Sequence, residues 1–267
     1  MMGILDLLPM KYRHRVADPV RSITMRVKHI VWYCSHPKDP DYHRIPIIIN
    51  NYNRLDCLQK LIKAMEDRGY TNIHILDNLS DYPPLLAWYE TCPYDVIRLD
   101  RNIGYLAIWE SGVYDRFKRS FYVYTDSDVV PDDNCPEDFM TRFLEVLRKY
   151  PRCLKVGFGL RIDDLPDCFD HKEAVLRNEG RFWKVPLGDG LYKAQIDTTF
   201  ALYRPFCYGP ANDHHLMIRT DEPYVARHLP WYVDSSNPSE EDLYYIRTSR
   251  QSTHWTSQMK KKADGQQ

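Results

Sequence analysis

The sequence predicts an α/β protein with a mostly parallel, Rossmann-like sheet flanked by helices. Short apolar runs of strand type alternate with segments of helical apolar spacing, and polar residues follow the ends of the runs. The chain has 267 residues, of which 43% are hydrophobic, so it can build one large domain with a sizeable core. Regular alternation of strand and helix is typical of a doubly wound parallel sheet.

The first predicted strand covers residues 45–49, a proline-containing isoleucine run of the kind found in buried strands. Apolar residues then recur at helical spacing from Leu58 to Met65, and Gly69 provides a helix stop. The same criteria predict the remaining elements: strands at 72–76, 96–99 and 121–124, and helices at 83–91, 106–117 and 136–150.

Residues 1–42 form a basic arm that differs from the domain predicted at 43–259 and from the polar tail at 260–267. The only acid between residues 10 and 33 is Asp18. One interpretation is a basic amphipathic helix that makes peripheral contact with an anionic membrane surface. The alternative is a helix packed on the main domain with a solvated basic face. Its basic residues are Lys11, Arg13, Arg15, Arg21, Arg26 and Lys28.

Charge and cysteine usage restrict the class of protein. A net charge of −1 gives no indication of nucleic-acid binding, and seven scattered cysteines without a CxxC pair favour a reducing compartment. We find no signal-peptide apolar region and no 18-residue apolar run. We therefore expect a cytoplasmic protein, with any membrane contact at the inner face.

Two aspartates, Asp126 and Asp128, follow the predicted strand at 121–124. Side chains two residues apart in an extended chain point the same way, so both carboxylates can face one point. Hard oxygen donors of this kind suit Mg²⁺ or Mn²⁺, which also bind substrate phosphates. The alternative is an acidic turn after a strand.

The ends of the other predicted strands are also polar. Ligands of open α/β sheets bind at the carboxyl ends of the strands, so four polar ends together predict a nucleotide pocket. We expect the first three ends to contact base and ribose, and the fourth to hold the diphosphate through a metal. The candidate residues at the first three ends are Asn51, Asn53, Arg54, Asp77, Asn78, Asn102 and Gly104.

This ordered set resembles the GT-A glycosyltransferases, especially the nucleotide-sugar-dependent enzymes of glycosyltransferase family 2, over roughly residues 43–257. The resemblance implies that Asp77 meets the base and that Asp126-Ser127-Asp128 is a DxD motif. Asp128 would then be the direct metal ligand, with Asp126 nearer the ribose or sugar. It further implies metal-dependent, inverting sugar transfer from a nucleoside-diphosphate sugar, with UDP favoured, to a hydroxyl group. The basic N-terminal arm and the lack of a membrane span suggest a glycan or lipid-linked acceptor, in surface polysaccharide or lipopolysaccharide synthesis.

The resemblance is less specific in the second half. It implies a catalytic base among Asp197, Glu241 and Asp242, and a late metal-binding histidine at His254. The alternative for Glu241 and Asp242 is structural, because acids in the first turn of a helix stabilise it through the helix dipole. An aromatic segment at 228–232 is expected to line the acceptor cleft.

Two other classes of protein remain open. The segment around Asp126 is also similar to the haloacid-dehalogenase phosphatase motif, in which that residue would be the nucleophile, although such a nucleophile normally lies on the first strand. A non-catalytic module that binds nucleotide sugars or glycans is the second alternative. A nucleotidyltransferase is disfavoured, because no glycine-rich phosphate loop follows the first strand.

Overall fold

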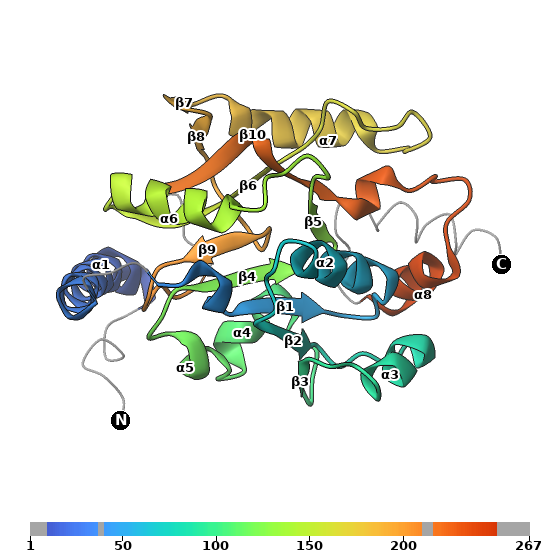
Figure 1. Cartoon of the computed structure of the whole chain (residues 1–267), viewed down its shortest axis with the longest axis horizontal. Helices are drawn as coiled ribbons and strands as arrows, with labels where there is room; N and C mark the ends of the chain where they lie inside the picture. Colours follow the sequence, from blue (N-terminus) through green and yellow to red (C-terminus); the bar gives the residue numbers. More distant parts are fainter. Residues whose placement is uncertain (1–9, 37–39, 210–215, 250–267) are drawn as a thin grey trace.

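The computed structural model describes residues 10–36, 40–209 and 216–249, and within them ten strands form one sheet (Figure 1). The predicted α/β fold with a helix-flanked sheet is confirmed. The strands are β1 (Ile47–Asn51), β2 (Ile73–Asp77), β3 (Asp95–Arg98), β4 (Tyr122–Asp126), β5 (Val129–Pro131), β6 (Cys153–Leu160), β7 (Pro186–Gly188), β8 (Leu191–Lys193), β9 (Ala201–Tyr203) and β10 (Leu216–His228).

Helices connect the strands and cover the sheet. The α-helices are α1 (Met10–Ser35), α2 (Asp56–Glu66), α3 (Pro83–Tyr89), α4 (Ala107–Glu110), α5 (Tyr114–Phe117), α6 (Phe139–Lys149), α7 (Lys172–Glu179) and α8 (Glu240–Thr248). The 3-10 helices are η2 (Tyr42–Arg44), η3 (Gly104–Leu106), η4 (Gly180–Trp183) and η5 (Leu229–Tyr232).

The sheet runs in the order β3-β2-β1-β4-β9-β6-β10-β8-β7, and β5 pairs with β10. The first four strands in this order are parallel to one another, as the strand–helix alternation predicts. In the second half β6 and β10 are parallel, whereas β9 is antiparallel to both β4 and β6. The predicted parallel sheet therefore describes the first half, and the second half adds antiparallel strands.

Each face of the sheet carries its own apolar core. Ile47 and Ile49 of β1 point to the core that α2 and α6 cover, and Ile48 points to the core formed with α4 and α5. All three are fully buried, each contributing about 1.5–3 kcal/mol. Burial on both faces explains why β1 is a continuous apolar run and not an alternating one.

The segment predicted as one helix at 106–117 is instead divided into η3, α4 and α5. Gly112 lies between α4 and α5 with a φ of 84°. This left-handed conformation is readily available to glycine and ends the first helix there.

Helix α1 packs on the domain through one face. Nε2 of His29 lies 2.6 Å from the Pro205 carbonyl oxygen, and the Trp32 indole donates to the Arg119 carbonyl at 2.8 Å. In Figure 1 this helix lies at the opposite end of β1 from α8. Its exposed side carries Ile23, Val27, Ile30 and Val31. No helix among the described residues is long and apolar enough to cross a membrane.

Candidate functional site

The register of the parallel strands brings the polar strand ends to one edge of the sheet. Asn51 of β1 pairs with Asp77 of β2, and Asp77 pairs with Arg98 of β3. On the other side of β1, Asn50 pairs with Asp126 of β4. The structure therefore brings the ends of all four predicted parallel strands to one edge through direct strand pairing.

Asp126 is held at the end of β4 by two neighbouring side chains. The Asn50 amide donates to its Oδ1 at 3.1 Å, and the Thr198 hydroxyl donates to its Oδ2. Burial, and next the nearby charge of Asp128, raise the pKa of Asp126 to about 7. Because the charge of Asp128 acts on Asp126, a cation bound by the two carboxylates would remove their mutual repulsion.

Asp128 lies next to a histidine that comes from the far end of β10. Nε2 of His228 is 3.6 Å from Oδ2 of Asp128. Burial lowers the pKa of His228, so its imidazole is neutral at pH 7 and able to ligate a metal. The backbone amide of Leu229 also donates to the Asp128 carbonyl at 2.8 Å, which fixes the two segments together.

Several polar atoms around the acidic residues are buried without a hydrogen-bond partner among the described residues. They are Oδ1 of Asn50, Oδ1 of Asp128, Oγ1 of Thr199 and Nδ1 of His228. Most buried polar atoms in proteins are hydrogen-bonded, so a cluster of exceptions calls for a polar ligand or an ion.

The donor set fits a divalent cation. Asp126 and Asp128 offer carboxylate oxygens and His228 offers an imidazole nitrogen, a combination that suits Mn²⁺. Within the described part of the chain, no group of three or more ligating side chains is already gathered closely enough to form a metal site. The fit therefore depends on the unpartnered Asp128 oxygen and on the proximity of His228.

A cavity of about 600 Å³, here called the main pocket, opens beside Asp126. Asp197, Thr198 and His228 line it, and Asp197 is exposed there. The buried Arg219 also lines the pocket; it forms an ion pair with Glu179, and its guanidinium lies 4.1 Å from the centre of the Phe182 ring. The pocket thus combines carboxylates, a cation and an aromatic face.

The turn after β2 is hydrogen-bonded to the segment at the start of η3. The Asn78 amide donates to the Gly104 carbonyl at 2.9 Å, and its oxygen accepts the Ile103 backbone amide at 2.7 Å. The Asn102 side chain accepts the Gly104 amide at 2.9 Å. Three of the predicted nucleotide-contacting residues therefore form one network that shapes this edge of the site.

Asp77 is fully buried at the same edge. It accepts from the Tyr89 hydroxyl at 3.1 Å, from the Ser80 amide at 3.2 Å and from the Arg98 guanidinium at 3.2 Å. Asn51 is also fully buried, and its amide donates to the same Tyr89 hydroxyl at 3.0 Å. Tyr89 thus links the ends of β1 and β2.

Asn53 and Arg54 make structural contacts. The Asn53 oxygen accepts the backbone amides of Asp81 and Tyr82 just before α3. Arg54 is buried and pairs with Asp242 at 2.5 Å. Both side chains fasten the turn after β1 to neighbouring segments.

Glu241 and Asp242 attach α8 to the domain. Oε2 of Glu241 accepts the backbone amides of Leu55 at 2.7 Å and Asp56 at 2.9 Å, at the start of α2. Asp242 pairs with Arg54 and completes a capping box with Ser239. Of the three predicted base candidates, Asp197 is the one that lines the main pocket.

Sequence reasoning did not identify Asn50, Thr198 or His228 as partners of the acidic residues. The sequence instead indicates an acceptor-lining aromatic segment for His228 and a metal-binding role for His254, which lies outside the described residues. The position of Asn50 at the end of an apolar strand is a signal that could have identified it. No sequence signal places His228 beside Asp128, because 100 residues separate the two.

No protein-family model matches this sequence, and no curated protein is similar enough in sequence to count as a relative. Solved structures do match in fold. One is glucosyl-3-phosphoglycerate synthase from Mycobacterium tuberculosis in complex with phosphoglyceric acid. It is 15% identical with a TM-score of 0.37, and the match covers 60% of this chain and 56% of the synthase.

Another match is GalNAc-T7 with UDP, GalNAc and Mn²⁺, at 14% identity and a TM-score of 0.48, covering 85% of this chain and 55% of that one. A cytidylyltransferase from Leptospira borgpetersenii serovar Hardjo-bovis matches at 9% identity and a TM-score of 0.33, covering 46% of this chain and 56% of the other. This chain thus spans little more than half the length of each. At these identities and scores the likenesses assign no activity.

Proposed function

We propose that this chain is a metal-dependent glycosyltransferase of GT-A type that transfers a sugar from a nucleoside diphosphate to a hydroxyl group. The observation that carries the proposal is the cluster of buried, unpartnered polar atoms around Asp126 and Asp128, beside the main pocket. Such a cluster is suited to a cation and a diphosphate. The edge formed by Asp77 and Asn78 lies across β1 from Asp126, and we propose that base and ribose bind along it.

The residues divide the chemistry as follows. Asp126, Asp128 and His228 would hold Mn²⁺ or Mg²⁺, which when bound neutralises the charge that develops on the departing diphosphate. We propose Asp197, which is exposed in the main pocket, as the base that takes the proton of the acceptor hydroxyl, a role worth about 10²–10⁴-fold in rate. Glu241 and Asp242 hold α8 in position. Transfer in this arrangement is proposed to invert the anomeric carbon.

A ligand-binding panel tests the proposal. UDP, GDP and dTDP, each with and without Mn²⁺, are added to the full chain, and the midpoint of thermal unfolding is measured. A ligand that binds only the folded state raises that midpoint. We expect one nucleotide, with UDP favoured, to stabilise the protein only when Mn²⁺ is present. Transfer or hydrolysis of the matching nucleotide sugar separates an enzyme from a binding module, and the absence of any Mn²⁺-dependent stabilisation would refute the proposal.

The phosphatase alternative is not favoured. In that reaction a second acidic pair would be needed near Asp126, and Asp163 and Asp164 are the candidates. Both are instead within ion-pair distance of Arg161, at 3.0 Å and 3.3 Å. Hydrolysis of a generic aryl phosphate by the purified protein, abolished by Asp126→Asn, would revive this alternative.

We further propose that α1 contacts the anionic inner face of a membrane, consistent with a cytoplasmic enzyme acting on a lipid-linked glycan in surface polysaccharide or lipopolysaccharide synthesis. The support is the exposed apolar stripe of Ile23, Val27, Ile30 and Val31 in a helix whose sequence contains a single acid, Asp18. Apolar side chains flanked by basic residues are suited to the headgroup region of a bilayer. Because α1 and α8 lie at opposite ends of β1, this contact would anchor the protein and would not line the site.

Vesicle sedimentation tests the membrane contact. Full-length protein is mixed with vesicles of pure phosphatidylcholine or with vesicles that also contain phosphatidylglycerol. We expect binding only to the anionic vesicles, and loss of that binding in the double variant Ile23→Asp, Val27→Asp. Val185→Asp is the matched control, since Val185 is also exposed but lies far from α1 in the sequence. Equal binding by the stripe variant would contradict this part of the proposal.

A further inference from the structure

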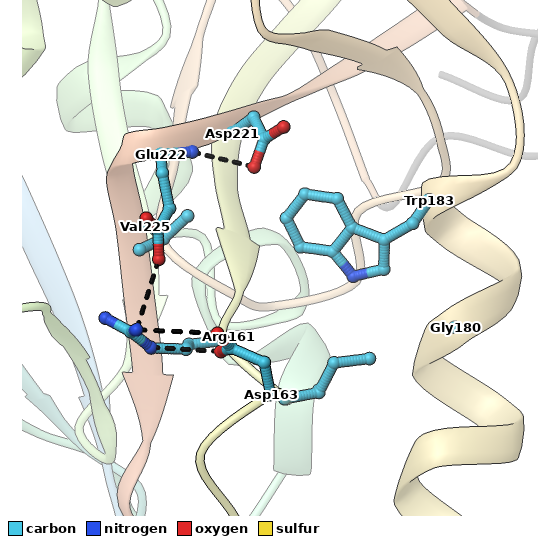
Figure 2. Close-up of a pocket in the computed structure, with 8 residues that line it drawn as sticks. Arg161, Asp163, Gly180, Trp183, Asp221, Glu222 and Val225 are labelled. Atoms are coloured by element: carbon cyan, nitrogen blue, oxygen red, sulfur yellow. Dashed lines mark hydrogen bonds and ion pairs between the residues drawn. The ribbon is translucent and has the colours of Figure 1, made fainter.

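A second cavity, here called the side pocket, lies next to the end of β6 and the middle of β10 (Figure 2). Its volume is about 310 Å³, which is at the lower end of the range for small-molecule sites. Arg161, Trp183, Asp221 and Glu222 supply its polar and aromatic lining. None of these residues has a part in the chemistry proposed above.

The side pocket adjoins the main pocket across one short segment. Glu179, Arg181 and Phe182 line the main pocket, whereas Gly180 and Trp183 of the same segment line the side pocket. The same division occurs at the end of β6, where Leu160 faces the main pocket and the next residues face the side pocket. A ligand longer than one sugar could therefore extend over the 178–183 segment from one cavity to the other.

Trp183 is fixed as one wall of the side pocket. Its ring lies against Gly159, where an added Cβ would overlap the indole, and Tyr192 contacts it edge-on with ring centres 5.2 Å apart. The indole Nε1 is buried and has no hydrogen-bond partner among the described residues. In Figure 2 the nitrogen edge of the ring faces the Arg161 and Asp163 side of the pocket.

Charged groups share the pocket with this ring; they come from the segment after β6 and from β10. Arg161 lies 3.0 Å from Asp163 and 3.3 Å from Glu222, so its charge is already balanced. One oxygen of Asp221 accepts the Glu222 amide at 2.8 Å, and within the described ranges no cation pairs with this carboxylate. The lining of the pocket is mostly apolar, with a few carboxylate acceptors and, among the described residues, no unbalanced positive charge, which favours a neutral ligand that has both an apolar face and hydroxyl groups over a phosphate.

We infer that the side pocket is a second sugar subsite, which binds the neutral sugar that precedes the acceptor sugar in an oligosaccharide chain. An aromatic wall beside carboxylates suits a pyranose, because the ring offers an apolar face and its hydroxyls donate to the acids. This inference rests on the proposed function, and it narrows the acceptor class to a glycan of at least two sugars.

Binding at Trp183 can be observed directly. The indole N–H signals of uniformly ¹⁵N-labelled protein are recorded by NMR, and Trp183 is assigned by its disappearance in Trp183→Phe. Methyl β-glucopyranoside, methyl β-galactopyranoside, lactose and maltose are then titrated one at a time. We expect at least one of them to shift the Trp183 signal saturably in the millimolar range. We also expect Asp221→Asn to weaken that binding at least fivefold, on the order of 1 kcal/mol.

Two controls separate this inference from the proposed function. Glu145→Gln changes an exposed acid on α6 and should leave the titration unchanged. Mn²⁺-dependent nucleotide binding is measured on the same samples and should be equal in Trp183→Phe and the wild type. If nucleotide binding is intact but no sugar shifts the Trp183 signal, or the shift survives unchanged in Asp221→Asn, the side pocket is not a sugar subsite. If the wild-type protein binds no nucleotide in the presence of Mn²⁺, the proposed function is refuted, whatever the result of the sugar titration.

Discussion

Nε2 of His228 lies 3.6 Å from Oδ2 of Asp128, although 100 residues separate them in the chain. The pairing depends on β5 and β10, which run antiparallel with Val129 opposite His228. This strand pair begins immediately after the two aspartates, so the sheet itself brings the histidine to the acidic residues. The relationship predicts how metal binding should respond to substitution.

Replacement of Asp128 by asparagine should abolish Mn²⁺-dependent nucleotide binding and sugar transfer while the fold is retained. The substitution keeps the side-chain shape and removes the charge that holds the cation. Isothermal titration with UDP and Mn²⁺ measures nucleotide binding, and far-UV circular dichroism checks that the fold is retained. Asp133→Asn is the control, because Asp133 is an exposed acid close by in the sequence. Retained transfer in Asp128→Asn would remove the metal role of this residue.

Substitution of His228 by alanine should weaken Mn²⁺ binding at least about tenfold, or ~1.4 kcal/mol, because one nitrogen donor is lost. The Mn²⁺ concentration needed for half-maximal nucleotide binding measures this. His43→Ala, which alters an exposed histidine, should have no effect on it. An unchanged Mn²⁺ requirement in His228→Ala would show that His228 is not a ligand of the metal held by Asp126 and Asp128.

Asp197 and Glu241 should give opposite results. Asp197→Asn is expected to lower kcat by about 10²–10⁴-fold and leave stability unchanged, because the carboxylate is exposed in the main pocket. Glu241→Gln should destabilise the fold by about 1–3 kcal/mol, because a carboxylate that accepts two backbone amides is replaced by a neutral group. Urea unfolding and turnover measured on both variants distinguish the roles. A large loss of kcat in Glu241→Gln at unchanged stability would assign the base to α8 instead.

Acidification should weaken the packing of α1. Burial, and next the charge of Arg204, lower the pKa of His29 from 6.5 to about 4. The folded state therefore keeps His29 neutral while the unfolded chain takes up a proton near pH 6.5. The stabilisation is complete above that pH and is lost progressively as the pH falls toward about 4, to a limit of about 3 kcal/mol.

Urea unfolding at a series of pH values from about 7 to 4 measures this loss of unfolding free energy. His29→Gln keeps a donor to the Pro205 carbonyl but does not titrate, so its stability should vary less with pH in the same window. Equal pH dependence in the two proteins would exclude His29 as the titrating group.

The parallel half of the fold could be predicted because its signals are local. The isoleucine run of β1 and the helical spacing that begins at Leu58 follow from burial on both faces of a sheet and on one face of a helix. The antiparallel position of β9 could not be predicted, because nothing within Ala201–Tyr203 indicates its neighbours β4 and β6. The break at Gly112 was missed because the apolar spacing continues across it.

The strand ends at which ligands are expected to bind could be recognised from the sequence alone, because a polar residue directly after an apolar run is a local feature. Asp126, Asp128 and Asp77 were identified in that way. Which distant side chains contact these aspartates depends on the three-dimensional fold. The fold brings His228 and Thr198 next to the two aspartates, and it uses the Glu241 carboxylate to accept backbone amides at the start of α2. Such contacts depend on long-range strand pairing and helix packing, and a single sequence contains no local signal for them.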